Sequence, residues 1–158
     1  MNVHHKPQTT RHLATEADTL ALGAALARGL RPGMVVYLKG ELGAGKTTLA
    51  RGVLRALGVA ERVKSPSFAL VEPYIISKLY LYHFDFYRIK SANEWSDAGL
   101  RECFNADSVC LVEWPEKAGA RLPAPDLTID LAIEGSGRRA ALGAATEAGR
   151  HCIKELEH

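Results

Sequence analysis

The sequence contains little cysteine, and this excludes two common ways of stabilising a small domain. Its three cysteines, Cys103, Cys110 and Cys152, are odd in number and widely spaced. Disulfide frameworks need paired cysteines, and zinc sites need them at short repeated spacings. We therefore expect reduced thiols, in the core or at the surface, in a chain that folds without covalent cross-links.

Long apolar segments are also missing. No stretch approaches the roughly 20 consecutive apolar residues that a membrane-spanning helix requires. The start of the chain, from Met1 to Arg11, is polar and rich in histidine, and it lacks the apolar centre of a signal peptide. We therefore expect a cytoplasmic protein without membrane contact.

Neither sign of charge dominates the composition. Twenty Lys and Arg residues face 18 Asp and Glu residues, which gives a formal net charge of +2. This excess is too small to indicate nucleic-acid binding by itself, because that would require a clustered basic face. With 47% hydrophobic and 24% charged residues, the 158-residue chain fits one ordinary globular domain.

The pattern of apolar residues divides the chain into three parts. We expect a flexible N-terminal arm over residues 1–12, one folded domain over 13–149 and a polar C-terminal tail, helical or loose, over 150–158. We find no internal repeat, no low-complexity tract and no linker long enough to separate two domains. The chain is long enough to bury a core of its own.

Within the domain, strand-like and helix-like segments alternate. Short apolar runs rich in β-branched and aromatic residues predict strands, and leucines at helical spacing predict helices. Two closely spaced strands between Phe68 and Phe86 are typical of an antiparallel hairpin. We predict the α/β class, with a mostly parallel central sheet flanked by helices and this hairpin attached. The predicted strands are 34–38, 68–74, 79–86, 109–112, 127–133 and one from 138 onward, and the predicted helices are 15–29, 46–57 and two short pieces within 91–104.

The strongest motif is the segment GELGAGKT, residues 40–47, which fits the phosphate-loop pattern G-x-x-x-x-G-K-[ST] at every fixed position. Glycines let such a loop curl so that its backbone N–H groups converge on phosphate oxygens, beside the positive end of the following helix. A lysine at this position reaches the β- and γ-phosphates, and the next hydroxyl can ligate Mg²⁺. An apolar strand before the motif and an amphipathic helix after it favour this interpretation over a chance match. We expect ATP phosphates to lie on Gly43, Ala44, Gly45, Lys46, Thr47 and Thr48.

Two acidic residues are candidates for the rest of the chemistry. Glu113 directly follows the buried strand 109–112, where a phosphate-loop ATPase needs a carboxylate that contacts Mg²⁺; the alternative is a surface glutamate after a strand. Asp85 ends the aromatic strand 79–86 and could orient the attacking water or support the metal from outside. Its alternative role is to cap the following turn.

Three further residues have an open role. Ser67, after Pro66, could meet the γ-phosphate in a segment that orders around it, although an ordinary Ser-Pro turn is the simpler interpretation. Trp114 could stack on a base, contact a partner or pack in the core. Arg88 could stabilise charge in the site or form a surface ion pair.

Four segments together carry a resemblance to a known family. GELGAGKTTLARG, SPSFALVEPY, YHFDFYR and CLVEWPE, in this order and spacing, resemble the bacterial TsaE (YjeE) family. The resemblance runs from about Leu13 to Gly143. It implies a fold like that of P-loop NTPases and an ATPase that acts in the biosynthesis of threonylcarbamoyladenosine in tRNA.

The resemblance also implies partners and roles. The family acts with the TsaB–TsaD heterodimer, which transfers a threonylcarbamoyl group to the adenosine beside the tRNA anticodon. The ATPase supports repeated turnover and is not the transferase, and it reaches tRNA through the complex, with direct contact left open. By matching position, the catalytic residues are Lys46, Asp85, Ser67 and Glu113, the Mg²⁺ contacts are Thr47 and Glu113, Trp114 lies in the adjoining loop, Thr15 and Glu16 lie near the adenine, and Gly137 and Arg138 lie near the nucleotide. Ser67 departs from the usual threonine of the family but retains its hydroxyl.

The expected activity is therefore Mg²⁺-dependent ATP binding and hydrolysis, slow without partners because no arginine finger is evident. Two alternatives are kept. A small-molecule kinase would normally carry a lid with several arginines, and Arg138-Arg139 is the nearest such pair. A non-enzymatic adaptor would bind its partners only together with ATP.

Overall fold

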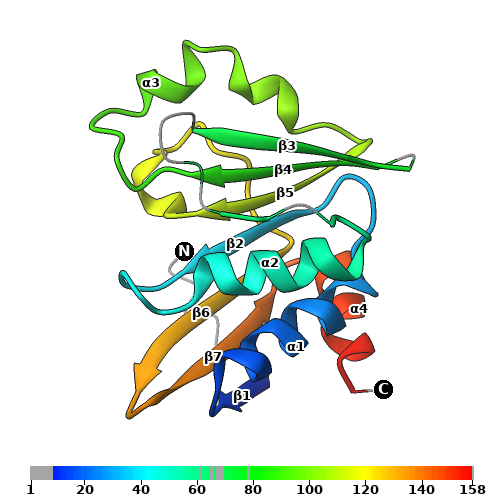
Figure 1. The fold of residues 1–158 in the computed structure, drawn as a ribbon. Coiled ribbons are helices and arrows are strands. Elements are labelled where there is room, and N and C mark those ends of the chain that lie inside the picture. The colour runs from blue at the N-terminus through cyan, green and yellow to red at the C-terminus, as the bar shows by residue number, and fades with distance from the viewer. Residues whose placement is uncertain (1–8, 61, 65, 67–69, 78, 158) are drawn as a thin grey trace.

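The computed structural model describes residues 9–157 with the exception of 61, 65, 67–69 and 78. In these ranges the chain forms one seven-stranded sheet with helices on both faces (Figure 1). None of the helices in the described ranges is both long and apolar enough to cross a membrane. The strands are β1 (Thr9–Leu13), β2 (Val35–Lys39), β3 (Val71–Ile76), β4 (Leu79–Asp85), β5 (Ser108–Glu113), β6 (Leu127–Glu134) and β7 (Gly137–Ala144); the α-helices are α1 (Glu16–Ala27), α2 (Lys46–Ala56), α3 (Asn93–Ser96) and α4 (Glu147–Glu155); and two 3₁₀ helices are η1 (Leu100–Cys103) and η2 (Pro115–Lys117).

The sheet is mixed, which corrects the expectation of a mostly parallel one. Its strand order is β1-β7-β6-β2-β5-β4-β3. The three inner pairs, β6–β2, β2–β5 and β5–β4, are parallel, whereas the three outer pairs are antiparallel. Short turns join β3 to β4 and β6 to β7, and a short turn between neighbouring strands permits only antiparallel pairing. The predicted hairpin at β3–β4 is therefore present, and a second one at β6–β7 makes the sheet mixed.

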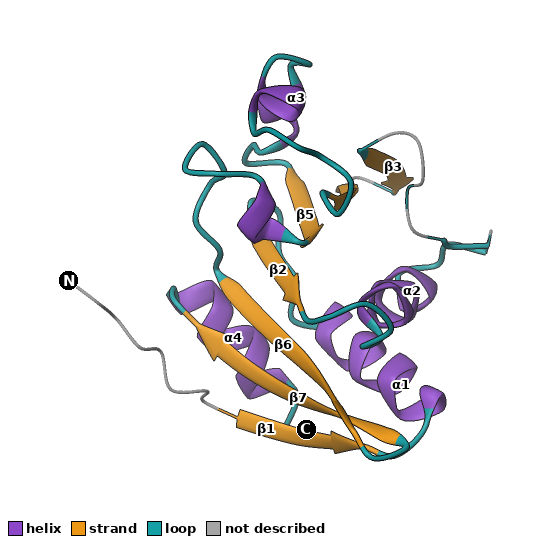
Figure 2. Ribbon diagram, turned by 90° about the vertical axis from the view of Figure 1, so that its left-hand side faces the viewer, coloured by secondary structure: helices purple, strands orange, loops and turns teal. Residues whose placement is uncertain are grey.

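Two different cores cover the two faces of the sheet. Helices α1 and α2 lie side by side on one face (Figure 2), where they and α4 bury an aliphatic core that includes Leu26, Leu49 and Leu111. On the other face, the segment from α3 to η1 covers β4 and β5, and an aromatic core there includes Phe84 of β4 and Trp95 of α3. The glycine-rich loop lies on the aliphatic face, at the start of α2, so the candidate site forms on that side of the sheet.

The register of the inner strands brings three chain segments to one edge of the sheet. Leu38 near the end of β2 and Asp85 at the end of β4 both pair with Glu113 at the end of β5. The glycine-rich segment 40–45 follows β2 directly and leads into α2. In parallel sheets, ligands bind at this carboxyl edge of the strands, so the topology places all the strongest candidate residues together.

The N-terminal end is more ordered than expected, and the C-terminal end takes the helical one of the two forms that the sequence left open. Residues 9–12 were assigned to the flexible arm, but they belong to β1, an edge strand that pairs with β7. Part of the expected polar tail belongs to α4, which Thr146 caps and which buries Cys152 and Ile153. The two ends also contact each other, because Arg11 donates a hydrogen bond to the Leu156 carbonyl. The buried Cys152 and Ile153 follow the buried Gly149 of α4 by three and four residues. So few apolar residues in a short polar segment make the helix hard to recognise from composition.

Candidate functional site

The loop between β2 and α2 depends on its glycines. Gly40 has a φ of 143° and Gly45, at the start of α2, has a φ of 103°, both in the region that side chains disfavour. At Gly40 a Cβ atom would also lie 2.4 Å from the Leu131 carbonyl oxygen. The loop can therefore adopt this curl only with glycine at these positions, and it places the N-terminus of α2 at the carboxyl edge of the sheet.

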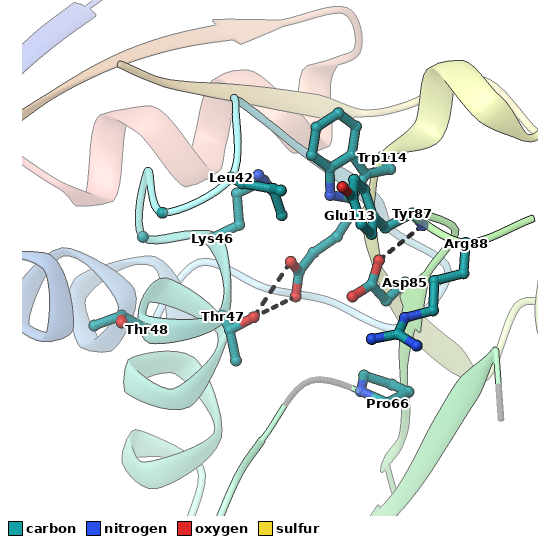
Figure 3. A pocket seen from close by; sticks show the side chains of 12 residues that line it. Leu42, Lys46, Thr47, Thr48, Pro66, Asp85, Tyr87, Arg88, Glu113 and Trp114 are labelled. Atoms are coloured by element: carbon teal, nitrogen blue, oxygen red, sulfur yellow. Dashed lines mark hydrogen bonds between the residues drawn. The ribbon is translucent and has the colours of Figure 1, made fainter. Parts of the chain in front are cut away.

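Two adjoining clefts open beside this loop. The first cleft has a volume of about 410 Å³ (Figure 3), and the second has about 240 Å³. They share Gly43, Gly45 and Thr48, so they run into one another along the loop. The first cleft is also lined by Leu42, Lys46, Thr47, Pro66, Asp85, Tyr87, Arg88, Glu113 and Trp114, and the second by Leu13, Ala14, Thr15, Glu16, Thr19, Ser136, Gly137 and Arg138.

Lys46 stands at the base of the first cleft with only 5% of its surface exposed. Its Nζ donates hydrogen bonds to the carbonyls of Gly40 at 2.5 Å and Glu41 at 2.9 Å. The ammonium also lies 4.4 Å from the centre of the Trp114 ring. Burial lowers the pKa of Lys46, and the attraction of nearby carboxylates, Glu113 foremost, offsets this only in part. Such a partly desolvated cation is suited to hold an anion.

A hydrogen-bonded line of side chains joins α2, β5 and β4. The Thr47 hydroxyl donates to the Glu113 carboxylate, with Oγ1 3.0 Å from Oε2 and 3.3 Å from Oε1 (Figure 3). The same Oε2 lies 2.6 Å from Nε2 of His83. Glu113 is 3% exposed, and His83 is entirely buried. The expected neighbours Thr47 and Glu113 do meet. His83 did not emerge as a site residue from the sequence; its position two residues before Asp85, on the same face of β4, is the signal that could have found it.

Asp85 closes a turn, which is the alternative role that the sequence left open, and it also lines the first cleft. Its Oδ1 accepts a hydrogen bond from the Tyr87 N–H at 2.9 Å, which closes a turn after β4. Its carboxylate also faces the first cleft, between Glu113 and Arg88 in Figure 3. The turn therefore holds an acidic group at the cleft wall, close to the other candidate residues.

Trp114 forms part of the cleft wall. It follows Glu113 in a left-handed conformation, with a φ of 57°, which non-glycine residues seldom adopt. Its ring packs 5.0 Å from the ring of Tyr87, and Lys117 donates a hydrogen bond to the Tyr87 carbonyl. The unusual backbone conformation thus turns the indole over Lys46, so that Trp114 lies between the aromatic core and the cleft.

The second cleft brings together residues that are far apart in sequence. Thr15 and Glu16 come from the start of α1, and Gly137 and Arg138 come from the start of β7. The Arg138 guanidinium donates to the Gly43 carbonyl from Nη2 at 2.9 Å and from Nε at 3.2 Å, and to the Gly137 carbonyl from Nη1 at 2.8 Å. This arginine therefore ties the glycine-rich loop to the turn between β6 and β7.

Thr15 has a structural role in the same cleft. Its hydroxyl accepts a hydrogen bond from the Asp18 N–H, and the Asp18 carboxylate accepts one from the Thr15 N–H. This reciprocal capping box begins α1. The Thr15 side chain lines the cleft while it satisfies the helix end.

One predicted residue lines neither cleft, and another is not among the described residues. Ala44 lines neither cleft, because its methyl group is fully buried in the aliphatic core and its N–H donates to the Glu41 carbonyl at 3.1 Å. Ser67 is outside the described residues. In the described part of the chain, the remaining predicted site residues line one or both clefts, together with residues that carried no assigned role, such as Leu42 and Tyr87.

The oxygens of Thr47 and Glu113 fit a magnesium ion. Mg²⁺ prefers oxygen ligands at about 2.1 Å in octahedral geometry, which places neighbouring ligands about 3 Å apart. The shorter Oγ1–Oε2 distance is 3.0 Å. Among the described residues, no group of three or more His, Cys, Asp or Glu residues could hold a metal ion alone, but Mg²⁺ commonly takes one or two protein oxygens and completes its shell with phosphates and water.

Comparison with known proteins shows the family of this chain. The family described as "Threonylcarbamoyl adenosine biosynthesis protein TsaE" matches residues 13–141. The chain is 40% identical, over 94% of its length and 98% of the relative's, to a tRNA threonylcarbamoyladenosine biosynthesis protein TsaE from Haemophilus influenzae, and 39% identical, over 77% and 76%, to one from Bacillus subtilis. The fold is similar to a crystal structure of YdiB from Bacillus subtilis, with a TM-score of 0.82, 31% identity and coverage of 98% of this chain and 97% of that one. The chain belongs to the TsaE family of tRNA threonylcarbamoyladenosine biosynthesis proteins.

Proposed function

We propose that this chain is a P-loop ATPase that binds ATP with Mg²⁺ and hydrolyses it. One observation carries the proposal: the Thr47 hydroxyl meets the Glu113 carboxylate at 3.0 Å, beside the ammonium of Lys46 and at the end of a glycine-rich loop. A hydroxyl, a carboxylate and a buried cation in this arrangement are what phosphoryl transfer requires of a P-loop protein.

The two clefts suggest how the nucleotide would lie. The phosphates would occupy the loop and the first cleft, where backbone N–H groups, the N-terminus of α2 and Lys46 attract negative charge. The adenine would occupy the second cleft, near Glu16 and Arg138. The shared lining at Gly43, Gly45 and Thr48 would let one molecule extend through both clefts.

The chemistry would proceed by attack of water on the γ-phosphate, giving ADP and inorganic phosphate. Lys46 would stabilise the charge that develops on the phosphate oxygens. Thr47 and Glu113 would hold Mg²⁺, which when bound neutralises charge on the β- and γ-phosphates. Asp85 would accept a hydrogen bond from the attacking water and orient it. We expect the isolated chain to be slow and a partner to complete the site.

The names of the relatives indicate the process that this ATPase serves. Proteins similar to this chain along most of its length are named for the biosynthesis of threonylcarbamoyladenosine in tRNA. We propose that the chain acts in the cytoplasm with the TsaB–TsaD heterodimer and that its ATP hydrolysis supports repeated rounds of modification at the adenosine next to the anticodon. Contact with tRNA would be made through that complex.

Reconstituted tRNA modification tests the proposal. TsaB, TsaD, tRNA and a source of threonylcarbamoyl-adenylate are combined with or without this chain and ATP. We expect more than one modified tRNA per TsaD only when both are present, and we expect the Asp85→Ala variant to bind ATP but not to support turnover. Multiple turnover without this chain, or full turnover with Asp85→Ala, would contradict the ATPase role; the latter result would favour a nucleotide-gated adaptor. ATP consumption that requires a small-molecule acceptor would instead indicate a kinase.

A further inference from the structure

His83 is a polar residue in an aliphatic environment. It lies on β4 and is entirely buried. Its neighbours along and across the strands on this face are apolar: Leu81 precedes it by two residues, and Leu111 pairs with it on β5. Burying an imidazole among such side chains is unfavourable unless a hydrogen bond compensates. Packing alone therefore does not account for a histidine at this position.

The compensating contact is made with Glu113. Nε2 of His83 lies 2.6 Å from Oε2 of Glu113. An ionised carboxylate has only acceptors, so Nε2 carries the hydrogen and donates it. The other ring nitrogen, Nδ1, is buried and has no hydrogen-bond partner among the described residues. Within those residues, the one hydrogen bond that this side chain makes is thus to the Glu113 carboxylate.

The contact restricts where that carboxylate can lie. Glu113 Oε2 accepts hydrogen bonds from His83 on β4 and from Thr47 on α2 at the same time. A free glutamate side chain samples several rotamers and loses that freedom when it is fixed. Because His83 is itself immobilised by burial, it fixes the carboxylate in advance, at the side of Thr47 that faces the first cleft.

We propose that His83 is a positioning residue that holds the Glu113 carboxylate in place for the magnesium ion of the bound nucleotide. This inference rests on the proposed function, because it concerns the metal ion of that same site. His83 touches neither cleft and so acts only through Glu113. Residues that hold metal ligands in this way typically change metal affinity or activity by roughly 10- to 100-fold when they are replaced.

Two substitutions that differ by one methylene group separate positioning from packing. In His83→Gln the amide nitrogen can reach the place of Nε2 and still donate to Glu113. In His83→Asn the amide ends near the place of Nδ1 and falls short of the carboxylate. Each protein is titrated with ATP in EDTA and again with ATP in excess Mg²⁺, and the ratio of the two dissociation constants gives the enhancement by Mg²⁺. Thermal unfolding without nucleotide is recorded in parallel.

We expect His83→Asn to lose roughly 10- to 100-fold of the Mg²⁺ enhancement, while its affinity for ATP in EDTA stays within about twofold of the wild type. His83→Gln should retain most of the enhancement. Leu81→Ala, a buried change two residues away, should lower the unfolding temperature but leave the enhancement unchanged. If His83→Asn does not fold at the assay temperature, His83→Leu, which suits the aliphatic surroundings, takes its place.

The same His83 substitutions made in the Glu113→Gln variant test whether His83 acts through Glu113. If His83 acts through the carboxylate, its replacement in a Glu113→Gln chain should cost no further enhancement, since coupled residues are not additive. Wild-type enhancement in His83→Asn, equal losses in the Asn and Gln variants, or additive losses in the Glu113→Gln background would each overturn the proposal. A wild-type chain whose ATP binding is unaffected by Mg²⁺ would contradict the proposed function itself, which is a different and distinguishable result.

Discussion

The two clefts that meet at the glycine-rich loop are built in different ways. In the first cleft, Lys46 is 5% exposed and Glu113 is 3% exposed, and the Glu113 carboxylate accepts a hydrogen bond from the Thr47 hydroxyl. In the second cleft, Thr15 and Glu16 are exposed, and Arg138 bonds to backbone carbonyls. Side chains fixed in advance are what catalysis requires, whereas exposed side chains suit recognition. We therefore expect substitutions in the first cleft to affect phosphate binding or the reaction, and those in the second to leave the reaction rate at saturating ATP unchanged.

Asp85→Asn should have the largest effect and should separate rate from affinity. The amide can still accept the Tyr87 N–H through its oxygen, so the turn after β4 should persist. It is a poorer acceptor for the attacking water, and losses of general-base catalysis are of order 10²- to 10⁴-fold. We expect single-turnover ATP hydrolysis to slow by about this factor, with Mg-ATP affinity changed by less than about threefold. Asp130→Asn, an exposed change on β6, serves as the control. Weaker Mg-ATP binding with an unchanged hydrolysis rate would contradict the assignment of Asp85 to the reaction.

Lys46→Ala should mainly abolish binding. The variant removes the buried ammonium that would pair with the phosphates, and charge-assisted hydrogen bonds are worth about 1.5–3 kcal/mol each. We expect calorimetry to show nucleotide affinity weakened by roughly a hundredfold. Lys39→Ala, at the end of the strand that leads into the loop, removes the same charge without touching either cleft and should bind normally. Unchanged affinity in Lys46→Ala would show that the first cleft does not hold the phosphates.

Arg138→Gln should have a smaller effect, confined to affinity. Glutamine cannot reproduce the guanidinium contacts with both Gly43 and Gly137. Losing partly exposed hydrogen bonds of this kind costs about 1 kcal/mol, which corresponds to roughly fivefold weaker ATP binding. The hydrolysis rate at saturating ATP should not change. Arg139→Gln, an exposed neighbour on the same strand, is the matched control. A lower hydrolysis rate at saturating ATP would mean that Arg138 takes part in the reaction, and it would contradict the difference proposed between the two clefts.

Thr15→Ala should have the smallest functional effect and act chiefly on folding. It removes the hydroxyl that accepts the Asp18 N–H at the start of α1. Loss of such a helix cap typically costs about 1 kcal/mol of unfolding free energy. Urea denaturation should show this loss, and Thr15→Ser should show almost none. ATP affinity should stay within about twofold in both variants; a larger loss in the alanine variant alone would mean that the Thr15 hydroxyl binds the base.

The sequence predicts the first cleft well because its residues lie next to local signals. The motif that contains Lys46 and Thr47 is contiguous, and Glu113 directly follows a short apolar run that is typical of a buried strand. Once two such strands are taken as parallel neighbours, their ends must meet, as Leu38 and Glu113 do. The hairpin and the broken helical segment around Gly99 follow from equally local patterns.

Features that depend on distant pairing could not be predicted in the same way. The contact between His83 and Glu113 requires knowing that β4 lies beside β5, which no local pattern specifies. The bond from Arg138 to Gly43 joins residues 95 positions apart. Strand β1 is short and polar, and it forms a strand because it pairs with the edge of β7. In each case the contacts that stabilise the segment are made with a partner far away in the sequence, and the segment's own residues do not reveal that partner.

Direct titration of the purified chain with ATP tests the central claim, which is that Lys46, Thr47 and Glu113 form one site for magnesium and triphosphate. ATP is titrated by calorimetry in excess Mg²⁺ and in EDTA, into the wild type and into Glu113→Gln. The account predicts saturable binding to the wild type that Mg²⁺ strengthens, and a loss of that strengthening in Glu113→Gln. Absence of binding to the folded wild type at millimolar Mg-ATP, or an undiminished Mg²⁺ effect in Glu113→Gln, would contradict it.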